Sequence, residues 1–385
     1  PAWLAAAGFI ALLALAGVFA SMAQSLAMGV EAPLGRPAVA AARTGSSAIT
    51  LGALGSAAAL ALLGGLALAW FKNRIPAAGL AFLLAAVVGA DLWRNATSFW
   101  RYSPPPQEVF RPDALTQRVT ATPLPYRTLD LGVYPGDGVA LMAYGIPQLL
   151  GHHGNELHRF DELMGGKNQW RNLSPQLLDL FAVRYVIAPA GPGSPDSLPG
   201  YRRVMDAAAT SPGTPGRLFE QENPSPYARV VPGGAKLDDS LIVATLVDPR
   251  LPGYDRVVFF APDAPVSPDS LTGWPEPSPS RAVVTEWVPG AMTVTLDPAP
   301  ERPSYLLVAE NWYPDWEAVV DGAPAHVVRG NHTLITVPLR AGARTVRLEF
   351  RSAEYQQGSV ISLLSLGVVL LGFAAPWVSR RRRRA

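Results

Sequence analysis

The residue types best suited to chemistry gather in one segment, GHHGNELHRFDELMGG, which spans residues 151–166 and holds three of the five histidines. If residues 155–164 form a helix, His158, Asp161 and Glu162 stand at positions i, i+3 and i+4, so their side chains share one face. Imidazole nitrogens and carboxylate oxygens on one helix face can bind a metal ion or contact a polar ligand.

Two further histidines, His152 and His153, precede this predicted helix and would complete a ligand set for Zn²⁺ or Mn²⁺. The segment has no HExxH motif or comparable zinc spacing, so we assign no metal ligand, and divalent metal binding stays open. A contact with an acceptor or a lipid pyrophosphate is a second interpretation, which would use His152, His153 and His158. A hydrogen-bonded loop packed on the core is the interpretation we favour.

Aromatic residues are concentrated in AENWYPDWEAVVDGAPAHVVRGNHT, residues 309–333. Aromatic faces stack on the apolar C–H patches of pyranose rings, so Trp312, Tyr313 and Trp316 could form a sugar platform. Trp316 alternates with apolar residues along a predicted strand, which indicates a core position. Trp312 and Tyr313 lie at the start of that strand, where an aromatic plug between sheets is common. We interpret the stretch as core and keep Trp312 and Tyr313 as candidates for glycan contact.

Other catalytic signatures are missing from the sequence. It has no cysteine, no GxSxG, no P-loop and no GxGxxG after a strand. The net charge is +2, but five positive charges form the single run Arg380–Arg384, so nothing resembles a nucleic-acid footprint. We therefore assign no catalytic residue and predict no nucleic-acid partner.

Long apolar stretches account for an unusual composition. Hydrophobic residues make up 49% of the chain and charged residues only 16%, against about 25% in soluble domains. About 20 helical residues cross the roughly 30 Å hydrocarbon core of a bilayer. The sequence predicts transmembrane helices at about 3–30, 48–71, 75–90 and 359–378.

Basic residues beside these helices predict the orientation. Lys72 and Arg74 lie between the second and third helices, and Arg380–Arg384 follow the fourth. Lys and Arg favour the cytoplasmic side. We therefore expect a multi-pass membrane protein with residues 92–358 extracytoplasmic and the tail 379–385 cytoplasmic. The chain opens at Pro1 without an initiator Met, which suggests a piece of a longer protein.

The stretch LWRNATSFWRYSPPP covers residues 92–106. From residue 93 to 106 it predicts an interfacial stalk, which follows the first three helices in residues 1–92. Its aromatic residues suit the membrane interface. Asp91 and Arg94, one helical turn apart, are most simply a solvated ion pair at the membrane edge. The alternative is a polar pair that faces a cavity.

The segment between the membrane helices predicts three parts. Residues 107–262 show mixed strand and helix patterns and predict an extracytoplasmic α/β domain. Residues 263–280 are rich in proline and serine, which is typical of a linker. Residues 281–356 alternate with period two between turn signals and predict an antiparallel β-sandwich.

Several stretches, in this order, carry a resemblance to the C-terminal portion of the YfhO-like bacterial membrane proteins, in the GT-C class of glycosyltransferases. They are YRTLDLG (126–132), YGIPQLLGHHGNELHRFDELM (144–164), LLDLFAVRYVIAP (177–189), ENPSPYARVV (222–231) and NWYPDWEAVVDGAPAHVVRGNHTLITVPLRAGARTVRLEF (311–350). The last is the most specific, although Asp315 stands where the family usually has glycine before Trp316.

The resemblance implies a glycosyltransferase that takes sugar from a polyprenyl-phosphate donor and adds it to a cell-envelope polymer. Catalytic carboxylates of this class lie in an upstream external loop that the sequence lacks, so this chain alone would be inactive. The alternative is a non-catalytic, membrane-anchored module that binds a glycan or a partner protein. A transporter would need charged or broken helices at mid-membrane, which the sequence does not predict.

Overall fold

The protein is described here by a computed structural model, which describes residues 2–29, 35–97, 99–100, 102–136, 138–151, 157–166, 169–209 and 213–382. The chain divides into two compact units, Pro1–Ser103 and Pro104–Ala385. His152 and His153 lie outside the described residues.

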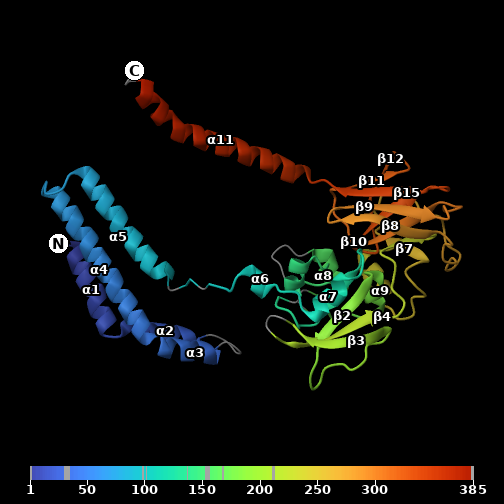
Figure 1. The fold of residues 1–385 in the computed structure, drawn as a ribbon, viewed down its shortest axis with the longest axis horizontal. Helices are drawn as coiled ribbons and strands as arrows, with labels where there is room; N and C mark the ends of the chain where they lie inside the picture. Colours follow the sequence, from blue (N-terminus) through green and yellow to red (C-terminus); the bar gives the residue numbers. More distant parts are fainter. Residues whose placement is uncertain are drawn as a thin grey trace. The chain divides into compact units, whose positions relative to one another are not determined.

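The first unit is helical (Figure 1). Its described helices are α1 Ala2–Leu15, α2 Val18–Met28, α3 Gly35–Thr44, α4 Ser46–Phe71 and α5 Ala77–Thr97. Helix α4 packs against α1 and α5. At a rise of about 1.5 Å per residue, α4 is longer than the hydrocarbon core is thick.

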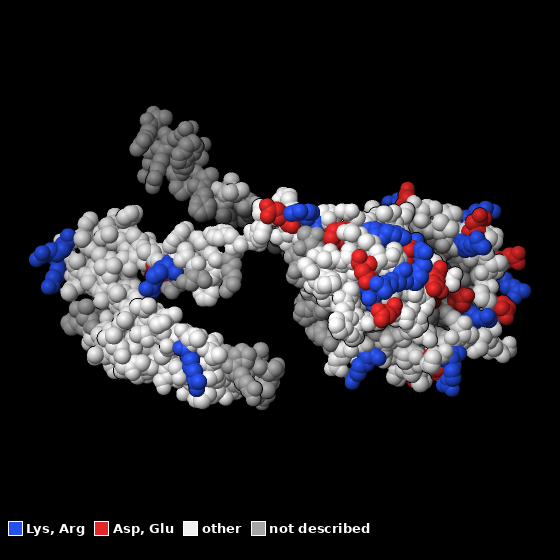
Figure 2. Space-filling view, turned by 60° about the horizontal axis from the view of Figure 1, so that its bottom comes forward, with Lys and Arg blue, Asp and Glu red and all other residues white. Residues whose placement is uncertain are grey.

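Three described helical stretches are long and apolar enough to cross a membrane: Ser46–Phe71, Ala77–Arg94 and Ala353–Gly372. Few charged residues appear on the face of the helical unit in Figure 2, whereas Arg, Lys, Asp and Glu are crowded over the second unit. These features indicate a membrane protein with a separate β-rich unit.

The span expected over residues 3–30 is not one continuous helix, because the chain bends by 59° between α1 and α2. Gly17 lies at this break with φ of 74°, a left-handed conformation that glycine adopts without a steric penalty. Residues 5–28 thus form either one broken span or a re-entrant pair of helices.

Two other boundaries in the helical unit differ from the sequence prediction. Helix α3 lies between the spans predicted at about 3–30 and 48–71, where the sequence analysis predicts no helix. Helix α5 begins after Pro76 and continues to Thr97, so the first residues of the predicted stalk 93–106 are helical. Proline suits a helix start, and Trp and Arg are compatible with helix, which explains the longer helix.

In its described residues, the second unit contains four sheets and seven helical segments. Its strands are β1 Arg127–Asp130, β2 Val183–Pro189, β3 Tyr201–Ala208, β4 Pro215–Gln221, β5 Ala228–Val231, β6 Gly233–Lys236, β7 Val257–Phe260, β8 Arg281–Val288, β9 Ala291–Asp297, β10 Ser304–Asn311, β11 Trp316–Val320, β12 Ala323–Ala325, β13 Val328–Gly330, β14 Leu334–Leu339 and β15 Thr345–Phe350. Its helical segments in the described residues are α6 Pro106–Val109, α7 Ala114–Thr120, the 3₁₀ helix η1 Val139–Tyr144, α8 His158–Met164, α9 Pro175–Leu180, α10 Asp239–Leu246 and α11 Ala353–Arg382.

The first sheet has strand order β1-β2-β4-β3, in which only β1 and β2 run parallel. One face packs on α7 and η1 through a core that includes Leu115, Leu141 and Ile187. The other face packs on α8 and α9 through residues such as Leu163, Leu177 and Val186. Helix α9 begins after the N-cap residue Ser174, whose Oγ accepts from the Leu177 N–H, and serine is among the residues that most often cap a helix in this way.

Two antiparallel sheets form the predicted sandwich: β13-β14-β10-β5 and β12-β11-β15-β9-β8. They share one core, to which Val230, Leu306 and Val337 contribute from the first sheet and Val294 and Leu348 from the second. The turn between β11 and β12 contains Asp321 and Gly322, both at positive φ, as a two-residue hairpin turn requires.

The expected boundary between an α/β domain (107–262) and a sandwich (281–356) does not separate two cores. Strand β5 lies in the first part but pairs with β10 of the sandwich. The core beneath α8 and α9 also includes Leu307 and Leu334. Residues 263–280 pack on this body, where Trp274 lies 6.3 Å from Phe259 between ring centroids. Composition alone suggested a linker, because proline and serine are frequent both in linkers between domains and in connections that pack on a domain.

Helix α11 follows β15 after two residues and starts earlier than the predicted span 359–378. Its described side chains near the start, such as Tyr355 and Val360, are exposed.

Candidate functional site

Helix α8 presents the polar residues of the histidine-rich segment. Leu163 and Met164 are fully buried and fix the helix on the core, and Gly165 ends it in a left-handed conformation. His158 Nε2 lies 3.0 Å from Glu162 Oε1, one turn along, which agrees with the spacing in the sequence. The helix therefore directs His158 and Glu162 away from the core.

The connection from β10 to β11 supplies an aromatic wall. Trp312 is half-buried against the sandwich core, and its backbone N–H donates to the Thr333 carbonyl oxygen at 2.7 Å. Tyr313 is 45% exposed, with its ring centroid 6.0 Å from that of Phe350. Trp316 packs on the sandwich core, as the alternation predicts. Tyr313 is thus not a core residue, and Trp312 is one only in part.

Asp239, the first residue of α10, joins α8 to the sandwich. Its carboxylate accepts from Arg159 Nη1 at 2.6 Å and from Arg329 Nη1 at 2.9 Å. Burial raises the pKa of Asp239, but the hydrogen bonds and charges of Arg329 and Arg159 outweigh it and lower the pKa to about 2. Asp239 therefore stays ionised and holds both guanidinium groups in place.

His332 lies between the two carboxylates and is 2% exposed. Its Nε2 is 3.0 Å from Glu162 Oε2, and its Nδ1 is 3.4 Å from Asp239 Oδ1 without a hydrogen bond to any described residue. Burial lowers the pKa of His332 more than Glu162 and Asp239 raise it. The neutral imidazole consequently donates from Nε2, because an ionised carboxylate only accepts.

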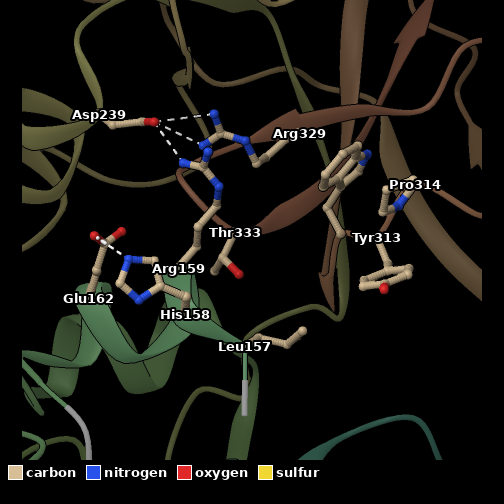
Figure 3. A pocket seen from close by; sticks show the side chains of 10 residues that line it. Leu157, His158, Arg159, Glu162, Asp239, Tyr313, Pro314, Arg329 and Thr333 are labelled. Atoms are coloured by element: carbon tan, nitrogen blue, oxygen red, sulfur yellow. Dashed lines mark hydrogen bonds and ion pairs between the residues drawn. The ribbon is translucent and has the colours of Figure 1, made fainter. Parts of the chain in front are cut away.

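One pocket of about 410 Å³ is lined by Leu157, His158, Arg159, Glu162, Asp239, Trp312, Tyr313, Pro314, Arg329 and Thr333. The buried His332 does not line it but contacts two of its carboxylates, Glu162 and Asp239. Figure 3 shows Arg159 and Arg329 converging on Asp239, the pair of His158 and Glu162 on α8, and Tyr313 on the sandwich side. The pocket brings together three candidates: His158 and, more than 150 positions further along the sequence, the adjacent Trp312 and Tyr313. Sequence reasoning missed Arg159, Asp239, Arg329 and His332.

The pocket combines an aromatic wall with planar hydrogen-bonding groups of both signs. Two arginines balance two carboxylates, and the buried His332 is neutral, so the pocket has little net charge. Aromatic rings bind apolar C–H faces, while guanidinium and carboxylate groups bind hydroxyls. Such a pocket can hold a neutral polyhydroxylated ring.

Metal binding gains no support from the described residues, which contain no group of three or more potential ligands placed to hold a metal ion. Glu162 and Asp239 direct their oxygens at nitrogen donors instead. The combination of His152 or His153 with α8 falls outside the described residues and stays untested.

The Asp91–Arg94 pair belongs to the other unit. Arg94 Nη2 donates to Asp91 Oδ1 at 3.2 Å, and the two side chains are 48% and 32% exposed. The arginine side chain also lies against Gly55 of α4, where a Cβ atom would come within 1.9 Å of Nη1. The pair therefore connects α5 to α4 at one end of the apolar stretch.

Comparison with known proteins leaves the chain without a family. No protein-family model, curated protein or solved structure matches it. Membership of the YfhO-like proteins thus stays a prediction from the motifs.

Proposed function

We propose that the β-rich unit is a membrane-anchored saccharide-binding domain, with a sugar ring seated between α8 and the 312–314 segment. The observation that supports this is the placement of Trp312 and Tyr313 across one pocket from His158, Arg159 and Asp239. A sugar needs both an apolar face to stack on and directional hydrogen bonds to its hydroxyls. The volume of about 410 Å³ lies within the range of small-molecule sites.

The test is sugar binding by residues 1–385 in lipid nanodiscs, first on an array of bacterial envelope glycans and then by titration of the best ligand. Tyr313→Ala should weaken binding about tenfold, since a lost aromatic contact costs about 1.4 kcal/mol. Tyr355→Ala, which removes a tyrosine 77% exposed on α11, is the matched control and should bind normally. Absence of any glycan ligand, or equal loss in both variants, would refute the proposal.

Within a longer protein, we propose that this pocket is a sugar subsite of a polyprenyl-phosphate-dependent glycosyltransferase. Two of the stretches that carry the resemblance, 144–164 and 311–350, supply opposite walls of the pocket. No catalytic residue is assigned to this chain, because Glu162 and Asp239 are held in hydrogen bonds. Transfer of labelled sugar into envelope polymer by the full-length protein, and none by residues 1–385, is the expected result.

We propose further that residues 92–358 lie outside a bacterial cytoplasmic membrane and that the C-terminus is cytoplasmic. The absence of cysteine makes this directly testable. Single cysteines at the exposed positions Ser270 and Asn73 would be treated with a membrane-impermeant maleimide on intact cells. Ser270→Cys should react at once and Asn73→Cys only after permeabilisation, and the reverse pattern would invert the topology.

A further inference from the structure

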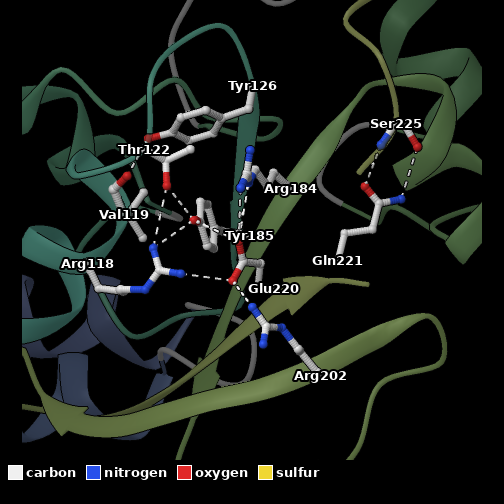
Figure 4. Close-up of polar contacts among 10 residues, drawn as sticks. All are labelled: Arg118, Val119, Thr122, Tyr126, Arg184, Tyr185, Arg202, Glu220, Gln221 and Ser225. Carbon is white, nitrogen blue, oxygen red and sulfur yellow. Dashed lines mark hydrogen bonds and ion pairs between the residues drawn. The ribbon is translucent and has the colours of Figure 1, made fainter. Parts of the chain in front are cut away.

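A second ionic cluster lies at one end of the first sheet, away from the sugar pocket. Glu220 is near the end of β4, and Arg184 and Arg202 are near the starts of β2 and β3. Because β4 runs antiparallel to both neighbours, these positions meet at the same end of the sheet. Arg118 reaches them from the last turn of α7. We call these four residues the Glu220 cluster (Figure 4).

The carboxylate of Glu220 is surrounded by donors. Oε2 accepts from Arg118 Nη2 and from Arg202 Nη2, each at 2.9 Å. Oε1 accepts from Arg184 Nη2 at 3.1 Å and from the Tyr185 hydroxyl at 3.2 Å. Because both Nη2 atoms bind the same oxygen, the distance between Arg118 Nη2 and Arg202 Nη2 is at most twice 2.9 Å. The carboxylate gathers three guanidinium groups into one small area.

The charges of the Glu220 cluster do not balance. Burial raises the pKa of Glu220, but hydrogen bonds from Arg184 and Arg202 and the charge of Arg118 outweigh it and lower the pKa. Glu220 therefore supplies one negative charge against three positive ones. Among the described residues, every ion pair of these three arginines goes to Glu220.

The opposite end of the same sheet provides a contrast. There Arg217 pairs with Asp196 and Asp206, and Arg203 pairs with Asp206, so two arginines meet two carboxylates. Like charges held a few ångströms apart repel by about 1 kcal/mol even in bulk water. The excess at the Glu220 cluster thus has an electrostatic cost that a bound anion would remove.

The guanidinium groups also retain donors that can reach a ligand. Arg202 gives one hydrogen bond to Glu220, and its side chain is 64% exposed. The side chains of Arg118 and Arg184 are about one-third exposed. Fixed guanidinium forks match the paired oxygens of phosphate and carboxylate groups.

We propose that the Glu220 cluster is an oxyanion-binding site that takes a phosphate or phosphate monoester group. Glu220 is the positioning residue, because it holds the three arginines together, while the outward N–H groups of Arg202, Arg184 and Arg118 contact the anion. The phosphate group belongs either to a soluble molecule or to a lipid headgroup. The site shares no residue with the sugar pocket and does not depend on sugar binding.

The test is calorimetric titration of residues 1–385, in nanodiscs of zwitterionic lipid, with inorganic phosphate at constant ionic strength. Arg202→Gln should weaken binding about tenfold, because one charge-assisted contact is lost. Arg202→Lys, which keeps the charge, should recover part of the affinity. Arg203→Gln is the matched control: it removes a neighbouring arginine of the same strand whose partner is Asp206, and it should bind phosphate normally.

The thermal midpoint of each variant without phosphate reports whether it is folded. Nanodiscs that contain an anionic phospholipid then identify the source of the phosphate. If wild type binds phosphate more weakly in these nanodiscs than in zwitterionic ones, and Arg202→Gln does not show this difference, a lipid headgroup occupies the site. If the anionic lipid leaves phosphate binding by wild type unchanged, the ligand is a soluble molecule. No saturable binding in zwitterionic nanodiscs, or equal binding by wild type and Arg202→Gln, would overturn the site.

Discussion

Asp239 in the pocket beside α8 and Glu220 in its cluster are both carboxylates held by arginines, yet their surroundings differ in charge balance and exposure. Asp239 accepts from Arg159 and Arg329, is about one-third exposed, and shares its pocket with a second carboxylate. Glu220 faces three arginines and its side chain is only 5% exposed. The same pairing chemistry therefore yields a nearly neutral pocket in one place and a positive site in the other.

The largest effect should come from Glu220→Gln, which keeps the side-chain volume and removes the charge. Three guanidinium groups would then face each other without a counter-charge, and breaking a buried ion pair costs about 3 kcal/mol or more. We expect a loss of unfolding free energy of about 3 kcal/mol, measured by thermal or denaturant unfolding in nanodiscs. Glu286→Gln, at an exposed position, is the control. Equal stability of the two variants would remove the distinction between the cluster and a solvated surface.

Asp239→Asn should have a smaller effect, about 1 kcal/mol, because water reaches this carboxylate and screens the arginines. It should also weaken sugar binding, since Arg159 and Arg329 would lose their common partner. Asp248→Asn is matched in chemistry, because arginine also lowers the pKa of Asp248 to about 2. Its partner Arg250 is 88% exposed and only two residues away in the sequence, so this pair joins no separate elements. The control should unfold like wild type. A loss in Asp239→Asn as large as in Glu220→Gln would contradict the comparison.

The smallest effect should be a pH dependence of stability between pH 6.5 and 5, to which His332 beside the pocket contributes and the carboxylate of the Glu220 cluster does not. Burial lowers the pKa of His332 below its ordinary 6.5, so below pH 6.5 the unfolded chain binds more protons than the folded one. Stability should therefore fall as pH falls below 6.5. Glu162 and Asp239 limit this fall by favouring the imidazolium, and Arg329 adds to it. His332→Gln should flatten the unfolding curve between pH 6.5 and 5, whereas His326→Gln, at an exposed position, should not.

Local patterns predicted many elements of this fold because their signals lie within a few residues. The Ser174 cap, the Asp321-Gly322 turn and the period-two strands of the sandwich each follow from adjacent residues. The bend at Gly17 was missed because a glycine within a long apolar run is also compatible with a straight helix. Strand β5 was assigned to the wrong part, since its partner β10 lies over 70 residues away.

The candidate site was predictable only where its signal was local. The spacing of His158 and Glu162 on α8 follows directly from helix geometry. Arg329 lines the same pocket, and His332 contacts its two carboxylates, because β13 and β14 place them opposite α8. No neighbouring residue in the sequence indicates this placement. Asp239 looked like an ordinary first-turn acid of a helix. The short turn Gly330–His332 carries a local structural sign of a functional loop: Asn331 and His332 both adopt positive φ, an uncommon conformation for residues other than glycine.

The aromatic wall adjoins the start of α11, and this limits how far a ligand can be from the bilayer if α11 spans it. Tyr313 touches Phe350, the Arg351 N–H donates to Asp315 O at 2.9 Å, and α11 begins at Ala353. Three residues reach at most about 10 Å. Tyr313 is therefore held close to the start of α11. If α11 spans the bilayer and the pocket binds a saccharide, the domain would select saccharides by their distance from the lipid surface as well as by their hydroxyls.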